Sequence, residues 1–330
     1  LYSRILTIRT RLVRYDPSVA AKYRLGLAWM FYGAAAFYQG RKDDAMTGFT
    51  ESIDTLEPIL PAGYEDTMTR LIWAYMNRAT VFNRTNYSRK SLVDTQKAID
   101  IFNEYAPREL RRYSLEMALV FMNRASVMVD LGEYVSGALL LRKACVILRK
   151  RFKAEPDIQN QVLLSTALMQ LANSQAAMGD LKHSHALNME ARELMVDLIE
   201  NKGYNDIENR LAIALHNDAE VSLELNRPEN GLKLLDKAIQ LVEKMKLAGR
   251  RDIDHLMPHA LHTQACIYHR LGKFMSALSS IESSMKEYRK LLGDTEEKAW
   301  LPDIAKMKII KGDILFDFGK KEEAKKTLQE

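Results

Sequence analysis

The sequence predicts an all-α fold, a right-handed α-solenoid of about seven helical hairpins, and three regularities carry this prediction. Small turn residues recur every 46 or 47 positions, at Gly40, Asn86, Gly132, Gly179, Asn226, Gly272 and Gly319. Columns at fixed distances from these turns hold only small residues. No stretch alternates apolar and polar residues as a half-buried strand does. A regular period of this length indicates a stacked helical repeat.

The seven turn residues predict where the first helix of each hairpin ends. Glycine and asparagine tolerate the left-handed backbone conformation in which helices commonly terminate. Before the first of these turns, the stretch Tyr2 to Tyr15, followed by Asp16 and Pro17, is typical of the second helix of a repeat whose first helix is absent.

Three columns of small residues predict close crossings between helices. Seven positions before the turns stand Gly33, Ala79, Ala125, Ala172, Ala219, Ala265 and Gly312. Five positions after the turns stand Ala45, Ser91, Gly137, Ser184, Gly231, Ala277 and Ala324. Twelve positions after the first six turns stand Ser52, Ala98, Ala144, Ala191, Ala238 and Ser284. Only small side chains fit where two helix axes approach most closely.

These patterns resemble the tetratricopeptide (TPR) family over essentially the whole chain. The resemblance is carried by segments such as Trp29 to Gly33 followed by Tyr38-Gln39-Gly40, and by Asn-Arg-Ala at positions 77–79 and 123–125. The usual family repeat has roughly 34 residues. Here each repeat is longer by about 12 residues, which we expect to add roughly 18 Å of helix.

Composition and chain ends set the expected organisation. The chain is 47% hydrophobic and 28% charged, has no apolar run of membrane-spanning length and shows no signal peptide. We therefore expect a cytoplasmic protein without membrane contact, folded as one superhelical domain over residues 1–330. Because both ends are cut within a repeat, we expect a segment of a longer protein.

Amide and hydroxyl side chains form a candidate binding column on the first helices. Nine positions before five consecutive turns stand Asn77, Asn123, Gln170, Asn217 and Thr263. An amide offers both a donor and an acceptor to the backbone of an extended peptide. In similar TPR arrays, asparagines here hold the main chain of a ligand in the concave groove. The alternative is that these side chains bond neighbouring helices together.

The preceding column combines methionines with histidines. It holds Met30, Met76, Met122, Met169, His216 and His262. Methionine is flexible and suits adaptable binding surfaces, but it also fills helical cores. We consider both a groove lined by methionines and an inter-helix core.

Histidines crowd into one predicted helix. His259, His262, Cys266 and His269 step by three, four and three positions and so share one face. This spacing is compatible with polar or pH-sensitive ligand contacts, with partial zinc ligation, or with ordinary packing. A straight helix cannot bring four ligands to one ion, and we assign no metal site. A nucleophilic role for Cys266 lacks an orienting third group.

Basic residues suggest a second type of contact. Arg149, Lys150 and Arg151 lie on the second helix of the third repeat, and a smaller group is formed by Arg108, Arg111 and Arg112. These groups could touch RNA phosphates or an acidic partner, or form a solvated outer face. For Arg78 and Arg124, which follow the asparagines, we consider bonding between helices and anion recognition.

Function is expected to be recognition rather than catalysis, because no catalytic motif is present in the sequence. We expect no cofactor, no direct DNA readout and no enzyme within these residues. The proposed role is a scaffold or regulatory segment that binds a peptide or partner protein in its groove and controls a fused or bound effector. The resemblance adds two alternatives. One is a regulator of the TPR–CHAT type, in which the array docks on an RNA-guided CRISPR effector and a caspase-like protease is fused to it. The other is a sensor of peptides or small ligands.

Overall fold

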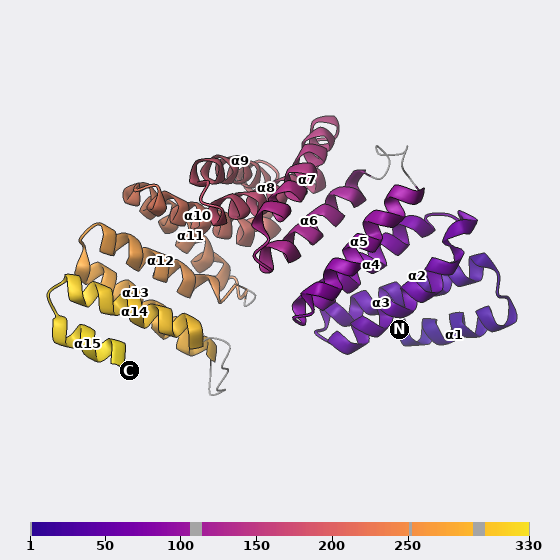
Figure 1. Cartoon of the computed structure of the whole chain (residues 1–330), viewed down its shortest axis with the longest axis horizontal. Coiled ribbons are helices and arrows are strands. Elements are labelled where there is room, and N and C mark those ends of the chain that lie inside the picture. The colour runs from indigo at the N-terminus through magenta and orange to yellow at the C-terminus, as the bar shows by residue number, and fades with distance from the viewer. Residues whose placement is uncertain (1, 106–113, 251–252, 293–300, 330) are drawn as a thin grey trace. The chain divides into compact units, whose positions relative to one another are not determined.

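The computed structural model describes residues 2–105, 114–250, 253–292 and 301–329, and the regular elements in these ranges are all helices (Figure 1). The first helices of the hairpins are α2 (Val19–Tyr38), α4 (Thr67–Arg84), α6 (Ser114–Asp130), α8 (Ile158–Ala177), α10 (Glu208–Glu224), α12 (Leu256–Arg270) and α14 (Leu301–Asp317). The second helices are α3 (Lys42–Leu56), α5 (Ser88–Tyr105), α7 (Tyr134–Ala154), α9 (Leu181–Glu200), α11 (Pro228–Leu247), α13 (Phe274–Leu292) and α15 (Lys321–Gln329). Helix α1 (Tyr2–Tyr15) packs on α2, and short 3-10 turns occupy Glu57–Ala62 and Asn205–Ile207.

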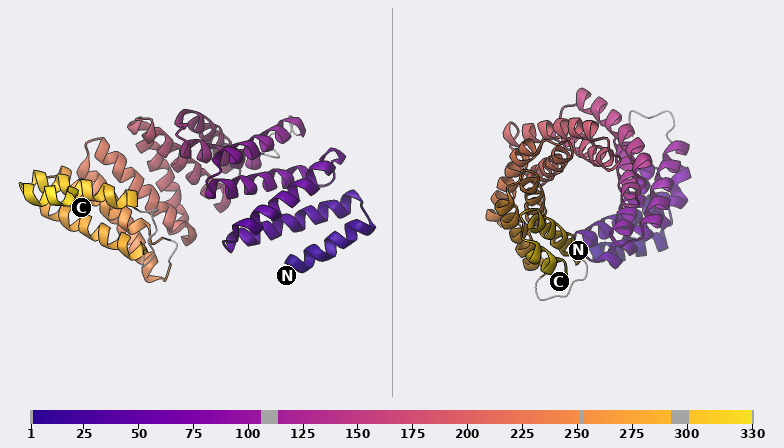
Figure 2. Two further views of the ribbon diagram at one scale, coloured as in Figure 1. Left: turned by 60° about the horizontal axis from the view of Figure 1, so that its bottom comes forward. Right: turned by 60° about the vertical axis from the view of Figure 1, so that its left-hand side comes forward.

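The helices form two compact units, residues 1–154 and 155–330. Unit 1 contains α1 and the hairpins α2–α3, α4–α5 and α6–α7. Unit 2 contains the hairpins α8–α9, α10–α11, α12–α13 and α14–α15. Within each unit every hairpin packs against the next, as the two directions of view in Figure 2 show. The predicted all-α class and the stacked hairpins are confirmed, whereas the single domain over residues 1–330 stays a prediction.

All seven predicted turns end a first helix in the left-handed conformation. Their φ angles range from 58° at Asn226 to 84° at Gly319. Two hydrogen bonds recur at each turn: at the first, the Gly40 amide donates to the Phe37 carbonyl at 3.0 Å and the Arg41 amide to the Ala36 carbonyl at 2.9 Å. This is the Schellman arrangement, which satisfies carbonyls left unpaired at a helix end. The repeat is therefore defined by local backbone chemistry.

The three small-residue columns are buried at the helix crossings. In the first hairpin, a Cβ atom added to Gly48 would lie 2.6 Å from the Gly33 Cα, so the two helices touch through their backbones. Two serines of the third column also bond across the crossing. Ser52 Oγ donates to the Gly26 carbonyl at 2.9 Å, and Ser284 Oγ donates to the Pro258 carbonyl at 2.7 Å. Small residues here thus serve both packing and hydrogen bonding.

Larger apolar residues fill the space between successive hairpins of each unit. In unit 1, Leu56, Leu71 and Ile72 are almost completely buried in one cluster. In unit 2, Met195, Leu198 and Leu235 are fully buried in another. Burial of such side chains contributes roughly 1.5–3 kcal/mol each, so the stack is stabilised between repeats as well as within them.

Helix length accounts for the long repeat, as predicted. Helices α4 and α5 have 18 residues each, and α8 and α9 have 20 each. None of the helices in the described ranges is both long enough and apolar enough to cross a lipid bilayer.

Candidate binding face on the first helices

The predicted amide column lies along one face of the first helices in each unit. Asn77 in α4, Asn123 in α6, Gln170 in α8 and Asn217 in α10 are half-buried, and Thr263 in α12 is buried. Their positions follow from the helical register, because each stands nine residues before a turn of the same geometry. What their side chains do differs between the two units.

In unit 2 the column bridges successive first helices. Asn217 Nδ2 in α10 donates to Asn173 Oδ1 in α8 at 2.9 Å. Thr263 Oγ1 in α12 lies 3.2 Å from Glu220 Oε1 in α10. In both bridges, one residue stands nine positions before the turn of its own hairpin. Its partner stands six positions before the turn of the preceding hairpin. The helix-to-helix interpretation of the column therefore holds at these two rungs.

His216 extends the second bridge into a chain of three polar groups. Its Nε2 atom lies 3.0 Å from Thr263 Oγ1 and 3.7 Å from Glu220 Oε1. If Nε2 carries a proton, it donates to the threonine oxygen while the threonine hydroxyl donates to the carboxylate. The histidine is thereby oriented by α12 as well as by its own helix.

A third type of bridge lies near the ends of the first helices. His269 Nε2 in α12 lies 2.8 Å from Asp317 Oδ2 in α14. At the equivalent place in unit 1, Asn83 Nδ2 in α4 donates to Asp130 Oδ2 in α6 at 2.9 Å. Each pair joins positions three before one turn and two before the next.

A recess of about 320 Å³ lies beside the Asn173–Asn217 bridge. It is lined by Asn173, Ala176, Leu181, Asn217, Glu220, Val221 and Glu224. Helices α8 and α10 form its walls, and Leu181 at the start of α9 closes one side. We call this feature the α8–α10 recess.

The α8–α10 recess offers both donors and acceptors to a ligand. The bridge uses one N–H of Asn217 and the oxygen of Asn173, so both N–H groups of the exposed Asn173 amide remain available. Glu220 and Glu224, one turn apart on α10, add two exposed carboxylates. Such a site suits the amide groups of an extended chain and a cationic or N–H donor group.

In unit 1 the amides are not used for bridging. Asn77 and Asn123 form no hydrogen bond with the described part of the chain, and both are half-buried. Their amides are consequently available to a ligand or to solvent. In α8 of unit 2, Gln170 Oε1 is buried and also lacks a partner among described atoms.

The methionine column belongs to the core, which corrects the assignment of Met76 and Met122 to partner contact. Their exposed fractions are 4% and 7%, and Met30 is buried as well. Met76 packs within the main cluster of unit 1, and the half-buried Met169 packs against the cluster of unit 2. Each methionine stands one position before the amide column and faces the neighbouring helices. These side chains therefore do not line an open groove.

The histidines of α12 point to separate partners. The Tyr288 hydroxyl lies 3.0 Å from His259 Nε2, with the two rings edge to face at 5.5 Å. Burial lowers the pKa of His259, and it also lowers the pKa of His262. Among the described residues no group of three or more His, Cys, Asp or Glu side chains is placed to hold a metal ion.

Burial raises the pKa of the Cys266 thiol to about 11. A nucleophilic cysteine requires the opposite shift, because the thiolate is the reactive form. Cys266 stands six positions before its turn. The same register position holds Glu220 in the preceding hairpin and Asp313 in the following one. A nucleophilic role is therefore unsupported.

The two arginines that follow the asparagines bond between helices. Arg78 Nε and Nη2 pair with the two carboxylate oxygens of Asp94 in α5 at 2.8 Å each. Arg124 Nη1 donates to the Leu92 carbonyl at 2.7 Å. Anion recognition by either residue would compete with these contacts.

The predicted basic patch lies at the end of α7. Arg149 and Lys150 are exposed, whereas Arg151 Nη1 donates to Ser114 Oγ at 3.1 Å. The other group, Arg108, Arg111 and Arg112, lies outside the described residues.

Solved structures with the same arrangement of helices identify the fold. The apo form of RapI has a TM-score of 0.63 at 14% identity, covering 98% of this chain and 78% of that chain. The fold is that of TPR-repeat proteins. The apo quorum sensor NprR from B. thuringiensis has a TM-score of 0.59 at 13% identity, covering 93% and 86%. A TPR protein from Parabacteroides merdae has a TM-score of 0.54 at 14% identity, covering 92% and 91%. No protein-family model and no curated protein sequence matches the chain.

Several residues on this face of the first helices are not part of the predicted site. Asn173 and Glu220 are bridge partners of the predicted column, Asp317 is the partner of His269, and Glu224 lines the recess. A signal existed, because bridge partners are separated by 43 to 48 positions, close to one repeat. Polar pairs at that separation would have included these residues as candidates.

Proposed function

We propose that this TPR-like chain is a recognition segment that binds an extended peptide, or an extended segment of a partner protein, on the face of its first helices. The observation that carries the proposal is the α8–α10 recess. It combines a positioned amide pair with two carboxylates, and the amides retain unused hydrogen-bonding groups. This chemistry fits a main chain that carries a basic side chain.

The comparisons add support for a regulatory form of this role. One structure with the same fold is a Rap protein complexed with Competence and Sporulation Factor, with a TM-score of 0.55, and another is the quorum sensor NprR. A sensor requires a ligand face whose occupation changes the packing of repeats. Bridges between successive first helices, such as Asn217–Asn173, provide a link of this kind because a ligand bound to the two amides contacts both helices at once.

The proposal is tested by selecting peptides from a random linear heptapeptide library on the immobilised chain and titrating the enriched peptides. We expect Glu220→Gln combined with Glu224→Gln to weaken binding at least about tenfold, because two acceptors lose their charge. Glu243→Gln, an exposed carboxylate on the second helix α11, serves as the matched control and should change affinity less than about twofold. Equal affinities for all three proteins would contradict the proposal.

A second set of variants separates the two units. Asn217→Ala removes the bridge amide of the α8–α10 recess, and Asn77→Ala combined with Asn123→Ala removes the unpaired amides of unit 1. Loss of binding in the first variant alone places the peptide in unit 2. Loss in the second alone moves the site to unit 1, and the recess is then not the site.

Docking on a ribonucleoprotein, with a CHAT-type effector under its control, is the alternative function. The observation that favours it is the exposure of Arg149 and Lys150 at the end of α7. It predicts that RNA co-purifies with the chain and is lost when both residues are changed to glutamine. Retention of RNA by that variant would contradict it.

A further inference from the structure

The positive charge of the chain is concentrated in its first two helices, α1 and α2. Residues 1–40 contain six Lys or Arg residues and one acidic residue, a net charge of +5. The whole chain also has a formal net charge of +5, so the remaining 290 residues carry equal numbers of each sign. Helix α1 alone holds Arg4, Arg9, Arg11 and Arg14 and no acidic residue. Such an imbalance produces a local positive field that attracts anionic groups.

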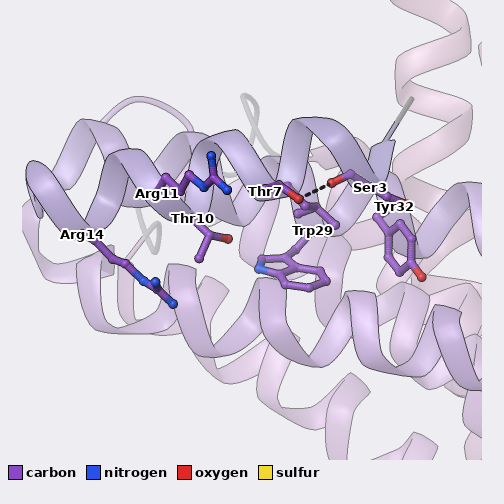
Figure 3. Close-up of a pocket in the computed structure, with 8 residues that line it drawn as sticks. Ser3, Thr7, Thr10, Arg11, Arg14, Trp29 and Tyr32 are labelled. Atoms are coloured by element: carbon purple, nitrogen blue, oxygen red, sulfur yellow. Dashed lines mark hydrogen bonds between the residues drawn. The ribbon is translucent and has the colours of Figure 1, made fainter.

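A pocket of about 460 Å³ lies between these two charged helices (Figure 3). It is lined by Ser3, Leu6, Thr7, Thr10, Arg11, Arg14, Trp29 and Tyr32. We call it the α1–α2 pocket. The α1 residues recur every three or four positions, so they form one stripe that follows the helix for about 16 Å. That length matches about five residues of an extended peptide.

The polar groups of the α1–α2 pocket are mainly donors without partners. Arg11 and Arg14 form no ion pair or hydrogen bond with the described part of the chain. The Trp29 indole N–H is likewise unpaired, and in Figure 3 it lies on the side of the ring facing Thr10 and Arg14. Within the lining, one hydrogen bond is formed, from Thr7 Oγ1 to the Ser3 carbonyl at 3.1 Å. No acidic side chain lines the pocket.

The floor of the α1–α2 pocket is apolar. Trp29 and Tyr32 stand edge to face, with ring centroids 5.9 Å apart, and both pack against the apolar cluster that contains Leu6. A ligand that matches both parts has carboxylates beside an apolar side chain. Guanidinium groups bind carboxylates through two parallel hydrogen bonds, and an aromatic floor accepts an apolar group.

We infer that the α1–α2 pocket binds an acidic peptide segment of a partner protein, with its carboxylates on Arg11 and Arg14 and an apolar side chain on Trp29 and Tyr32. The pocket is concave and short, which favours a peptide over a lipid surface or a long nucleic acid strand. This site lies in unit 1 and is separate from the acidic α8–α10 recess. The chain therefore presents two sites of opposite charge preference.

The test is a fluorescence anisotropy titration of the full chain with a labelled six-residue peptide of four glutamates and two leucines. We expect saturable binding, and binding at least about tenfold weaker when glutamines replace the glutamates. Arg11→Gln combined with Arg14→Gln should weaken binding of the acidic peptide at least about tenfold. The matched control is Arg4→Gln with Arg24→Gln, two exposed arginines of the same two helices outside the pocket, which should change affinity less than about twofold.

Three results would overturn the inference. One is the absence of saturable binding, and another is an equal loss in the two double variants, which would indicate diffuse attraction. The third is that a single-stranded hexanucleotide RNA, or vesicles containing one-fifth phosphatidylserine, binds more tightly than the acidic peptide and no longer binds the Arg11→Gln, Arg14→Gln variant. The variants Glu220→Gln and Glu224→Gln should leave acidic-peptide binding intact, so failure here is distinguishable from failure of the proposed function.

Discussion

Asn188 occupies a core position that apolar side chains fill in most other repeats. Nine positions after five of the other six turns stand the buried residues Phe49, Thr95, Leu141, Leu235 and Ile281, and Leu328 after the last turn is exposed. Asn188 is 0% exposed, and neither atom of its amide forms a hydrogen bond with the described part of the chain. Burying an unpaired polar group opposes folding. The residue is therefore a local source of instability in α9.

Asn188→Leu should raise the free energy of unfolding by about 1–3 kcal/mol, because it removes that desolvation cost. The measurement is urea unfolding followed by circular dichroism. Leu235→Asn, the reverse change at the equivalent position of the next repeat, should lower stability. A destabilised Asn188→Leu protein would show that the amide has a partner of its own.

Cys266 should react slowly with alkylating agents in the folded chain. With a pKa of about 11, its thiolate fraction at pH 8 is on the order of 100-fold below that of an ordinary cysteine. Iodoacetamide labelling, resolved by peptide mass spectrometry, should accelerate about tenfold per pH unit from pH 8 to pH 10. Because folding raises the pKa of Cys266, the neutral thiol stabilises the folded chain at every pH below the pKa that the residue has in the unfolded chain. This contribution to the free energy of unfolding is lost as the pH rises toward 11. Labelling at pH 8 as fast as in the unfolded chain would contradict this.

At the scale of elements, the Arg78–Asp94 pair joins α4 to α5. The arginine engages both carboxylate oxygens, its Nη1 lies 3.3 Å from Thr50 Oγ1 in α3, and Asp94 is 3% exposed. Three consecutive helices of unit 1 thus share one buried ion pair.

Arg78→Ala should destabilise the chain by about 3–5 kcal/mol, because it leaves the Asp94 carboxylate buried without its counter-charge. The measurement is urea unfolding of the chain, followed through signals that report on unit 1. Arg41→Ala, which breaks an exposed pair with Asp44, should leave the midpoint almost unchanged. If the two variants behave alike, the buried pair is not important for stability.

The elements were largely predictable from sequence, while the bridges between them leave only a spacing of 43 to 48 positions, which does not by itself select the pairs. The turns at Gly40 and Asn86 were found because a positive φ restricts residue choice locally. The partner of Asn217 depends instead on the stagger of α8 against α10, which no single repeat encodes. Met76 shows the same limit, since a one-position rotation decides between groove and core.

At the scale of the whole molecule, each unit contains its own apolar core. Clusters around Leu71 and Phe49 lie in unit 1, and clusters around Leu235 and Ile281 lie in unit 2. Fragments 1–154 and 155–330 should therefore each be helical and unfold cooperatively when expressed separately. Circular dichroism melts provide the measurement, and an unfolded fragment would contradict the expectation.

The central claim is that the chain recognises an extended peptide on the face of its first helices. The most direct test is hydrogen–deuterium exchange of the full chain with and without a library-selected peptide. We expect slower exchange in the final turns of α8 and α10, around Asn173 and Glu220. Exchange should be unchanged in α11 and in the part of α9 that follows residue 181. Protection confined to the second helices, or absent from α8 and α10, would contradict the account.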